Sequence, residues 1–338
     1  MKLATLRDGS RDGQLVVVSR DLNRAVSAHP YAATLQQALD SWSTSAPMLE
    51  ELYHKLNAGS ASNIFKFLPE QAMAPLPRAY QWCDASAFLS HGERMQRAFN
   101  LPPIEGVESI PLMYQGASDD FIGPLDPIVA DAEHGIDFEG EFGVIVDDVP
   151  MGCPAERASG HIKLIVLLND ISLRLLAPRE MKTGFGFLQA KPSTAFAAVA
   201  ITPDELGDAW QSDRVTLRLE AQVNGDWFGS PCAATMHYSF SQLIAHAART
   251  RKLGAGTVIG SGTISNEGIA NGFTCISERR AADQLEQKEL TPYLRYGDRV
   301  RLTALDSEAS SPFGSIEQTV VARAALNNLE RQPLVQAE

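Results

Sequence analysis

Hydrophobic and polar positions in the first 75 residues change from a strand pattern to a helical one. The apolar run Leu15–Val18, with three β-branched valines, favours a short strand. The stretch Thr34–Trp42 is typical of a helix. A second helix, ending before Gly59, is predicted where apolar residues recur at the i, i+3, i+4 and i+7 spacing of one helical face. These apolar residues are Leu49, Leu52, Tyr53 and Leu56.

A proline-rich junction separates this first unit from the rest of the chain. Residues 73–78 read Met-Ala-Pro-Leu-Pro-Arg, and proline disfavours a continuing helix at its own position and at the residue before it. We therefore predict a small N-terminal α/β domain over residues 1–75 and a larger domain over residues 76–330.

The larger domain shows short apolar runs and many turns instead of long helical periods. Ile136–Val146 alternates strictly, which predicts a strand with its acidic residues on one face. Val215–Val223 alternates as well, and Asn224-Gly225 follows it as a hairpin turn. A helix is predicted over Ser239–Arg251 and a late strand over Gly297–Leu302. The fold class that this pattern favours is α+β, mainly mixed β.

Composition and charge narrow the class of protein. The chain has 338 residues, enough to bury a sizeable core, and a net charge of −12, which disfavours nucleic acid as a partner because phosphate binding needs a basic surface. Its apolar runs are too short to span a membrane, and its first residues lack the apolar core of a signal peptide. The four cysteines form no C-x-x-C pair, so we expect reduced thiols in a cytoplasmic protein.

Glu139 and Glu141 carry the first chemical signal. Residues two apart on a strand share a face at about 6–7 Å, so these carboxylates repel each other unless a cation lies between them. Ligands with oxygen only suit a hard ion such as Mg²⁺, Mn²⁺ or Ca²⁺ rather than zinc. An exposed strand with two solvated glutamates is the alternative interpretation.

Three further side chains lie where a site would need them. Asp170 follows Ile165–Asn169, which is predicted as a buried strand, and strand ends are where sheet proteins place ligands. Asp84 and His91 flank a short segment just after the proline-rich junction. A histidine there can act as a general base near neutral pH. A plain turn at Asp170 and a structural role for His91 are the alternatives.

Lys191 and a glycine-rich turn complete the set of signals. Lys191 lies among apolar and small residues, where a buried cation can stabilise an oxyanion, although an exposed loop lysine fits the same pattern. The segment Gly260–Gly268 follows a predicted strand and can bring backbone N–H groups and the hydroxyl of Thr263 close to an anion. It lacks the G-K-[ST] ending of a phosphate-binding loop.

Taken in order, these segments resemble the fumarylacetoacetate hydrolase family over roughly residues 77–321. The resemblance implies a small N-terminal domain, a C-terminal mixed β-sandwich or roll, and a homodimer. It is carried by Asp84 with His91 seven residues later, Tyr114-Gln-Gly, Asp137-Phe-Glu-Gly-Glu141, Asn169-Asp-Ile-Ser-Leu-Arg174, Lys191 after Phe-Leu, and Gly260-Ser-Gly-Thr-Ile-Ser265.

The resemblance also implies roles for single residues. The implied metal ligands are Asp84, Glu139, Glu141 and Asp170, with Mg²⁺ as the expected ion and Mn²⁺ or Ca²⁺ left open. The implied catalytic residues are His91, Lys191 and a glutamate that orients the histidine. We choose Glu278 for that glutamate and expect it on the strand after the glycine-rich turn, with Glu267 as its competitor. The implied substrate-binding residues are Arg174, Tyr114 and Thr263.

The implied activity is the metal-dependent cleavage of a C–C bond in a 1,3-diketo acid, above all of fumarylacetoacetate to fumarate and acetoacetate in tyrosine breakdown. Acylpyruvate hydrolysis, and decarboxylation or isomerisation of a keto diacid, stay open within the same family. A non-catalytic, metal-stabilised dimeric binding protein is the alternative of another class. Ser86, Asn100 and Ala177 depart from family positions that contact substrate, and Arg94 or Arg97 are candidates to replace the arginine lost at Asn100.

Overall fold

The N-terminal segment folds as its hydrophobic pattern predicts. The computed structural model describes residues 1–306 and 309–324. Thr34 caps the first helix through its hydroxyl oxygen, which accepts a hydrogen bond from the N–H of Gln37 at 3.1 Å. The predicted strand and both predicted helices are confirmed. The elements are β1 (Lys2–Leu6), β2 (Gln14–Val18), β3 (Arg24–Ser27), α1 (Leu35–Asp40), α2 (Trp42–Asn57) and β4 (Phe65–Lys66).

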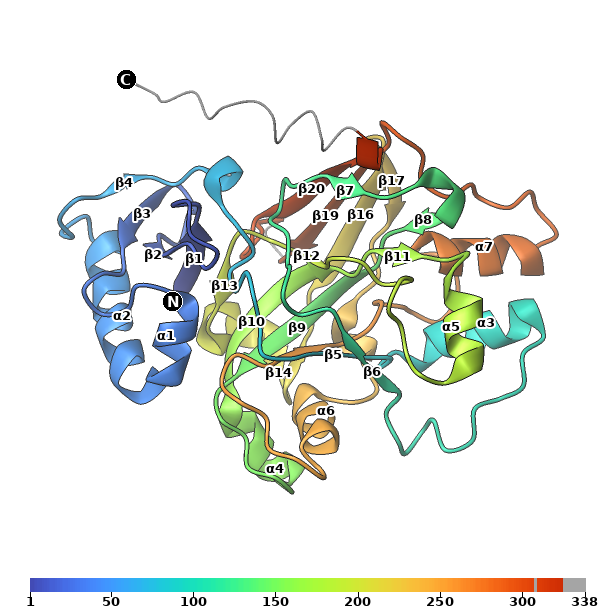
Figure 1. Cartoon of the computed structure of the whole chain (residues 1–338), viewed down its shortest axis with the longest axis horizontal. Coiled ribbons are helices and arrows are strands. Elements are labelled where there is room, and N and C mark those ends of the chain that lie inside the picture. Colours follow the sequence, from blue (N-terminus) through green and yellow to red (C-terminus); the bar gives the residue numbers. More distant parts are fainter. Residues whose placement is uncertain (307–308, 325–338) are drawn as a thin grey trace.

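The N-terminal strands continue the large sheet of the molecule rather than forming a sheet of their own (Figure 1). β1 pairs antiparallel with β13, so the sheet runs in the order β4-β3-β2-β1-β13-β10-β9-β18-β5-β6, with β12 beside β10. The domain boundary at residue 75 stays a prediction. The further strands of this sheet are β5 (Trp82–Ala85), β6 (Met113–Gly116), β9 (Gly140–Val146), β10 (Ile162–Asn169), β12 (Ala195–Phe196), β13 (Ala200–Ile201) and β18 (Val258–Gly260).

The central strands β9 and β10 are buried on both faces. Phe142 and Val144 of β9 belong to the main core, whereas Ile145 points into a second core beneath α1 and α2. The main core also holds residues of the smaller sheet, such as Leu219 and Ile316, so the two sheets pack face to face. That smaller sheet has the order β17-β16-β19-β20-β7. Its strands are β7 (Ile128–Val129), β16 (Arg218–Val223), β17 (Asp226–Gly229), β19 (Arg299–Leu305) and β20 (Ser315–Val321).

The predicted hairpin after residue 223 is confirmed. Asn224 and Gly225 have φ angles of 56° and 88°, and positive φ at both central residues is what a two-residue type I′ turn requires. The predicted helix after Ser239 is also present, and its capping box joins the Ser239 and Gln242 side chains to the backbone at its start. The fold class α+β is therefore confirmed.

Three helices lie together at one end of the large sheet, on the right of Figure 1: α3 (Leu89–Phe99), α5 (Ala177–Thr183) and α7 (Ile276–Leu285). The other helices are α4 (Ala155–Ala158), α6 (Phe240–Ala247) and the 3₁₀ segments Pro69–Gln71, Ala132–His134, Ser159–His161, Pro203–Ala209 and Ala233–Thr235. The remaining strands are β8 (Ile136–Asp137), β11 (Ser172–Leu173), β14 (Trp210–Gln211) and β15 (Arg214–Val215). No helix in the described part of the chain is long and apolar enough to cross a membrane.

The single strand predicted over Ile136–Val146 is wrong, because the chain changes partners within it. β8 pairs with β11, whereas β9 pairs with β10. Between them, the N–H of Glu139 donates to the side-chain oxygen of Asn169 at 3.0 Å, and the carbonyl of Glu139 accepts from the N–H of Asp170 at 3.0 Å. The bonds of Glu139 therefore tie the break in this strand to the end of β10.

Candidate active site

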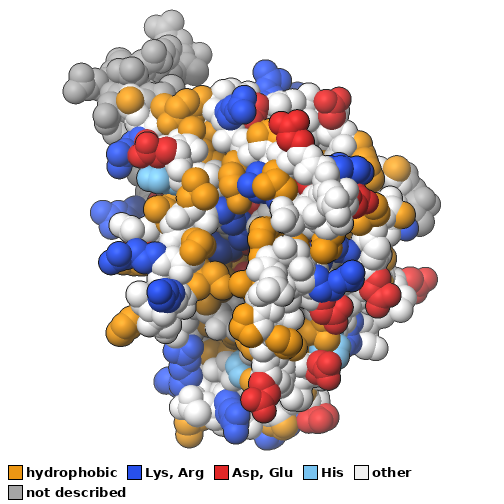
Figure 2. Space-filling view, turned by 90° about the vertical axis from the view of Figure 1, so that its right-hand side faces the viewer, with side chains coloured by type: hydrophobic (Ala, Val, Ile, Leu, Met, Phe, Trp, Pro, Cys, Tyr) orange, Lys and Arg blue, Asp and Glu red, His pale blue; other side chains and the backbone are white. Residues whose placement is uncertain are grey.

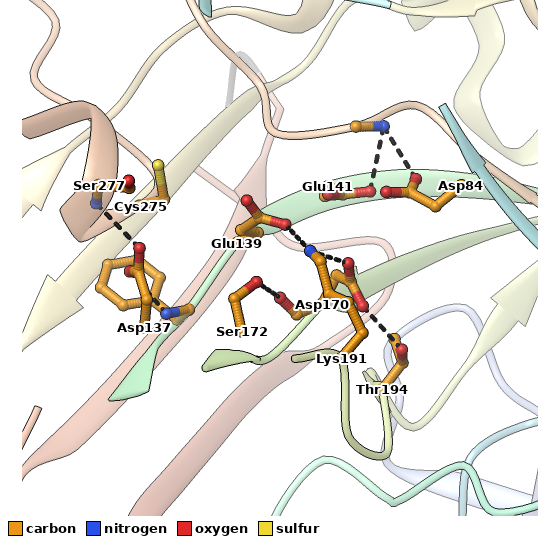
Figure 3. A network of polar contacts seen from close by, with 12 residues as sticks. Asp84, Asp137, Glu139, Glu141, Asp170, Ser172, Lys191, Thr194, Cys275 and Ser277 are labelled. Atoms are coloured by element: carbon orange, nitrogen blue, oxygen red, sulfur yellow. Dashed lines mark hydrogen bonds and ion pairs between the residues drawn. The ribbon is translucent and has the colours of Figure 1, made fainter. Parts of the chain in front are cut away.

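Three carboxylates carried by β5, β9 and the end of β10, three strands of the large sheet, form the centre of the candidate site. Asp84 lies on β5, Glu141 on β9, and Asp170 directly after β10. All three side chains are buried, and one oxygen of each lies within 4.8 Å of the others (Figure 3). The sheet register produces this grouping, because Glu141 is opposite Leu168 near the end of β10, and Asp84 is opposite Gly260 on β18.

This cluster fits a hard divalent cation. Burial, and after it the charge of Asp170, raises the pKa of Asp84 well above its usual value. Burial and the charge of Asp84 do the same to the pKa of Glu141. The Oε1 atom of Glu141 is buried, and no group in residues 1–306 or 309–324 forms a hydrogen bond with it. An orphaned buried acceptor among three carboxylates is what an oxygen-ligated cation would satisfy.

Glu139 lies beside this cluster in a different electrostatic setting. Its Oε1 accepts from Arg174 Nη2 at 2.5 Å and its Oε2 from Lys191 Nζ at 2.5 Å. Burial alone would raise the pKa of Glu139, but these two cations outweigh burial and hold that pKa well below its usual value. The structure thus brings three of the four predicted ligands within one ion's reach and pairs the fourth with cations.

Lys191 is buried, as the sequence predicts for a functional lysine. Its ammonium group bridges Glu139 and Asp170, which are 52 and 21 residues away in sequence (Figure 3). Burial would lower the pKa of Lys191, but the charges of Asp170 and Glu139 raise it well above the usual value. The side chain is therefore cationic at neutral pH.

Asp170 is oriented by two further hydroxyl donors. The hydroxyl of Tyr114 donates to its Oδ2 at 2.6 Å, and the hydroxyl of Thr194 donates to its Oδ1 at 3.0 Å. Burial and the charge of Asp170 raise the pKa of Tyr114 well above its usual value, so the phenol stays protonated. The predicted substrate contact Tyr114 thus also supports a predicted ligand.

The glycine-rich turn directs its backbone at these carboxylates. The N–H of Gly262 donates to Asp84 Oδ1 at 3.2 Å and to Glu141 Oε2 at 3.1 Å. Gly262 has a φ of 77°, and a Cβ there would lie 2.3 Å from the carbonyl oxygen of Ala85. Thr263, the next residue, is buried. The anion nearest to this turn is therefore the acidic cluster itself.

His91 and Glu278 meet across two helices. His91 lies in the first turn of α3 and Glu278 in the first turn of α7. His91 Nδ1 is 3.5 Å from Glu278 Oε2, and neither of these two buried atoms has a hydrogen-bond partner among the described residues. Glu267, the competing glutamate, is exposed. The prediction that Glu278 lies on a strand is wrong: Cys275 caps a helix there and accepts from the N–H of Glu278 at 3.3 Å.

Asp137 is a residue whose part in the site was missed by sequence reasoning. It is fully buried and accepts from the N–H groups of Ile276 at 2.7 Å and Ser277 at 2.9 Å, at the start of α7 (Figure 3). It also accepts from Arg174 Nε at 2.8 Å. Asp137 therefore connects the helix of Glu278 to the arginine that holds Glu139. Its position two residues before Glu139 was the available signal.

Arg174, predicted to bind substrate, uses its guanidinium on protein carboxylates. Its Nε and Nη2 are engaged by Asp137 and Glu139. Two of the three departures from the family pattern lie at helix ends: Asn100 caps the end of α3 with a φ of 50°, and Ala177 begins α5. The third, Ser86, is half-buried just after β5.

The segment that leads to Lys191 is fixed by Glu180 of α5. The carboxylate of Glu180 accepts from the N–H groups of Leu188 at 3.1 Å, Gln189 at 2.8 Å and Ala190 at 3.0 Å. Figure 2 shows the face of the molecule that carries α3, α5 and α7, where basic side chains stand among hydrophobic ones. The segment around α5 exposes the large apolar side chains Leu175, Met181, Phe185 and Leu188.

The chain is similar in sequence to two characterised proteins. The chain is 28% identical over 169 residues to a 2,4-didehydro-3-deoxy-L-rhamnonate hydrolase of Sphingomonas sp. (strain SKA58), a match covering 48% of this chain and 55% of that protein. It is 23% identical over 251 residues to the oxaloacetate tautomerase YisK of Bacillus subtilis (strain 168), covering 73% of this chain and 79% of that protein.

The whole chain also resembles solved structures. A maleylpyruvate hydrolase from Sphingobium sp. SYK-6, solved with manganese(II) and pyruvate, superposes with a TM-score of 0.63 at 16% identity, over 95% of this chain and 99% of that one. Residues 81–321 match the family model described as fumarylacetoacetate (FAA) hydrolase C-terminal, and residues 1–78 match that of fumarylacetoacetase N-terminal domain 2. The chain therefore belongs to the fumarylacetoacetate hydrolase family.

Proposed function

We propose that this protein is a divalent-metal-dependent hydrolase that cleaves a C–C bond of a 1,3-diketo acid, with fumarylacetoacetate as the first candidate substrate. The observation that carries the proposal is the His91–Glu278 pair within electrostatic reach of Glu139, the predicted fourth ligand beside the acidic cluster. Its two facing atoms are 3.5 Å apart, and the charge of His91 acts on Glu139. A histidine oriented by a buried carboxylate is the arrangement of a general base.

The ion-binding residues in this proposal are Asp84, Glu141 and Asp170, with Glu139 as the predicted fourth. A divalent ion there, which we propose to be Mg²⁺, would supply Lewis-acid stabilisation to the oxygens of the diketone. The rule that hard ions take oxygen ligands leaves Mn²⁺ and Ca²⁺ as alternatives. The solved maleylpyruvate hydrolase holds manganese(II), which supports a divalent ion without selecting Mg²⁺.

Proton transfer in this proposal is the task of His91. The Nδ1–H of His91 would donate to Glu278 Oε2, which is 3.5 Å from Nδ1 in this structure, and would thereby fix the tautomer in which Nε2 is unprotonated. Nε2 then takes a proton from a water molecule, whose oxygen attacks one ketone carbon of the substrate. The C–C bond next to that carbon breaks, and its electron pair forms the enolate of the leaving product. The protonated imidazole returns the proton to this enolate, so the reaction consumes one water and yields two acids or one acid and a ketone.

Lys191 is the residue that we propose to stabilise the developing alkoxide. Its ammonium is buried and has three N–H donors, two of which are used on Glu139 and Asp170. Thr263 lies on the adjacent turn as a second proposed contact. Arg174 and Tyr114 remain the proposed contacts for the substrate's carboxylate or distal carbonyl. Arg174 would use N–H groups other than those given to Asp137 and Glu139.

The test is turnover of fumarylacetoacetate and of acylpyruvates by the Mg²⁺-loaded protein, followed as loss of the diketone absorbance. We expect His91→Ala to lower kcat by about 10²–10⁴-fold, the contribution of a general base. Mg²⁺ affinity, measured by calorimetry, stays unchanged in that variant. Turnover by His91→Ala at the wild-type rate would contradict the role of the histidine.

A second candidate activity is keto–enol tautomerisation of a keto diacid, favoured by the match to an oxaloacetate tautomerase over 73% of this chain. Tautomerisation changes the enol absorbance without forming a new acid, and decarboxylation releases CO₂, so product analysis separates both from hydrolysis. Tight Mg²⁺ retention without any turnover would favour a binding protein instead. The proposal also includes a place in tyrosine catabolism and a homodimer, the latter tested by light scattering.

A further inference from the structure

Arg94 lies one helical turn after His91 on α3 and points toward the same neighbour. Residues three apart share a helix face, so both side chains reach α7. The side chain of Arg94 is only 10% exposed and forms an ion pair with Glu278. A buried guanidinium is costly unless it is paired, and both terminal nitrogens of Arg94 have hydrogen-bond partners.

Arg94 and Ser265 together occupy one oxygen of Glu278 and leave the other for His91. Arg94 Nη1 donates to Glu278 Oε1, and the hydroxyl of Ser265 donates to the same oxygen at 2.5 Å. Glu278 Oε2 has no such partner and faces His91 Nδ1. The two oxygens of one carboxylate therefore have separate tasks, anchoring and orientation of the imidazole.

The other terminal nitrogen of the Arg94 guanidinium, Nη2, binds the end of the glycine-rich segment Gly260–Gly268. Arg94 Nη2 donates to the carbonyl oxygens of Asn266 at 2.8 Å and Gly268 at 2.6 Å. The guanidinium carbon also lies 5.3 Å from the centre of the Phe273 ring. A planar fork makes these contacts at once, whereas the single ammonium of a lysine cannot reproduce them.

We infer that Arg94 is a positioning residue that orients the Glu278 carboxylate for His91, an inference that rests on the proposed general-base function. Arg94 does not contact the acidic cluster through any hydrogen bond or ion pair found in the described residues. Its loss therefore acts on proton transfer and leaves ion binding intact. Because Nη1 and Nη2 of Arg94 already donate to oxygens of the protein, Arg94 is also not a free substitute for the family's substrate-binding arginine.

The first test compares Arg94→Met with Arg94→Lys in the full-length, Mg²⁺-loaded protein. We expect Arg94→Met to lower kcat by about 100-fold, the lower end of a general-base contribution, and Arg94→Lys to recover about a tenth of the lost activity. KM and Mg²⁺ affinity change less than about twofold in both. The matched control is Arg279→Met, because Arg279 lies over the same Phe273 ring at 5.8 Å but pairs with Asp283.

A double-variant cycle shows whether Arg94 acts through Glu278. If it does, Arg94→Met/Glu278→Gln has the kcat of Glu278→Gln alone, because the second change removes a contact already lost. The neutral pair also avoids leaving a buried glutamate without its cation, so it folds even where Arg94→Met does not. Equal activity of Arg94→Met and Arg279→Met, or additive losses in the double variant, would overturn the inference.

A spectroscopic readout separates this inference from the proposed function. The ring nitrogens of His91 are followed by NMR in protein labelled with nitrogen-15 histidine, and His91→Gln assigns the signal among the seven histidines. We expect the tautomer protonated at Nδ1 in the wild type and its loss in Arg94→Met, with Arg279→Met unchanged. This result needs no turnover, so a protein inactive on every diketo acid would refute the function alone. An unchanged His91 signal in Arg94→Met refutes the positioning role.

Discussion

Glu139 and Glu141 are two residues apart and nearly inaccessible, with 5% and 0% exposure, yet they lie in opposite electrostatic surroundings. Arg174 and Lys191 pair with Glu139 and lower its pKa. Glu141 faces Asp84 and the N–H of Gly262, and its pKa is raised by burial and by that neighbouring aspartate. Burial alone therefore does not decide the charge of these carboxylates; the position of the cations does.

This difference shows where the protein supplies its own counter-charge and where it needs one from outside. In the part of the site around Glu139, two side-chain cations, Arg174 and Lys191, neutralise the carboxylate charge. The half formed by Asp84 and Glu141 pairs with no side-chain cation among the described residues, and the two carboxylates share one backbone donor, the N–H of Gly262. A divalent ion bound in the second half, as proposed, would relieve the repulsion there, while Lys191 would stay with Glu139 and Asp170.

The comparison predicts opposite effects of the same substitution on the metal-free protein. Glu139→Gln leaves Arg174 and Lys191 with one carboxylate fewer and lowers the free energy of unfolding by about 3 kcal/mol, the lower end for a broken buried ion pair. The lower end applies because Asp137 and Asp170 still pair with these cations. Glu141→Gln removes a repelling charge and leaves the stability unchanged or raises it. Urea unfolding in the presence of EDTA measures both variants.

If Glu139→Gln and Glu141→Gln lowered the free energy of unfolding equally, the proposed difference between the surroundings of the two glutamates would be wrong. It would mean that Glu141 is held by attractive contacts in the metal-free protein as Glu139 is. A gain of stability in Glu141→Gln that disappears on adding Mg²⁺ would sharpen the comparison, since the ion stabilises only the protein that binds it.

The raised pKa values of Asp84 and Glu141 predict how the stability of the metal-free protein depends on pH. A carboxyl whose folded pKa lies above its unfolded value binds its proton more tightly when folded. The stability it contributes is present at low pH and is lost as pH rises through the raised pKa. Each such carboxyl lowers the free energy of unfolding by up to about 1.4 kcal/mol for each pH unit above about pH 4, until its raised pKa is reached. Glu139 has a lowered pKa, so the stability that it contributes is present at neutral pH and is lost as pH falls below about 4.

Urea unfolding at a series of pH values, with Glu141→Gln as the reference, isolates this contribution from other groups. We expect the stability of the wild type to fall relative to that variant as pH rises, and added Mg²⁺ to stabilise the wild type more at high pH because fewer protons must be displaced. A difference between the two proteins that does not change with pH would contradict the raised pKa of Glu141.

The acidic residues of the site were predictable from sequence, but the sequence did not show that Glu139 pairs with cations while Asp84 and Glu141 do not. Alternating residues and a buried strand before Asp170 made the carboxylates candidates, and the resemblance to the family grouped them. The alternation of residues 136–146 did not reveal the change of strand partners at Glu139, because both faces of this segment are buried and the local period is the same in either sheet. The pairing of Glu139 with Arg174 spans 35 residues, a contact that only tertiary packing creates.

The helix that carries Glu278 was not predictable from sequence either, because contacts from distant parts of the chain fix it. The segment Thr274–Glu278 contains residues that fit a strand, and Cys275 is an unusual helix cap. Two buried contacts from elsewhere in the chain fix the helix instead: Asp137 binds its first N–H groups, and Arg94 holds Glu278 from α3. Local propensity is overruled by long-range hydrogen bonds of this kind.

The smallest expected effect concerns Thr194, whose hydroxyl donates to Asp170 at 3.0 Å. Thr194→Val keeps the volume of this buried side chain and removes the donor that orients Asp170 toward the Asp84–Glu141 half. Changes in groups that orient a metal ligand cost about 10–100-fold in affinity, and we expect about tenfold because Tyr114 still donates to Asp170. The matched control is Thr303→Val, which loses a bond to Ser315 in the smaller sheet. Calorimetric titration with Mg²⁺ that finds equal affinities in both variants would place the ion away from Asp170 and nearer to Glu139.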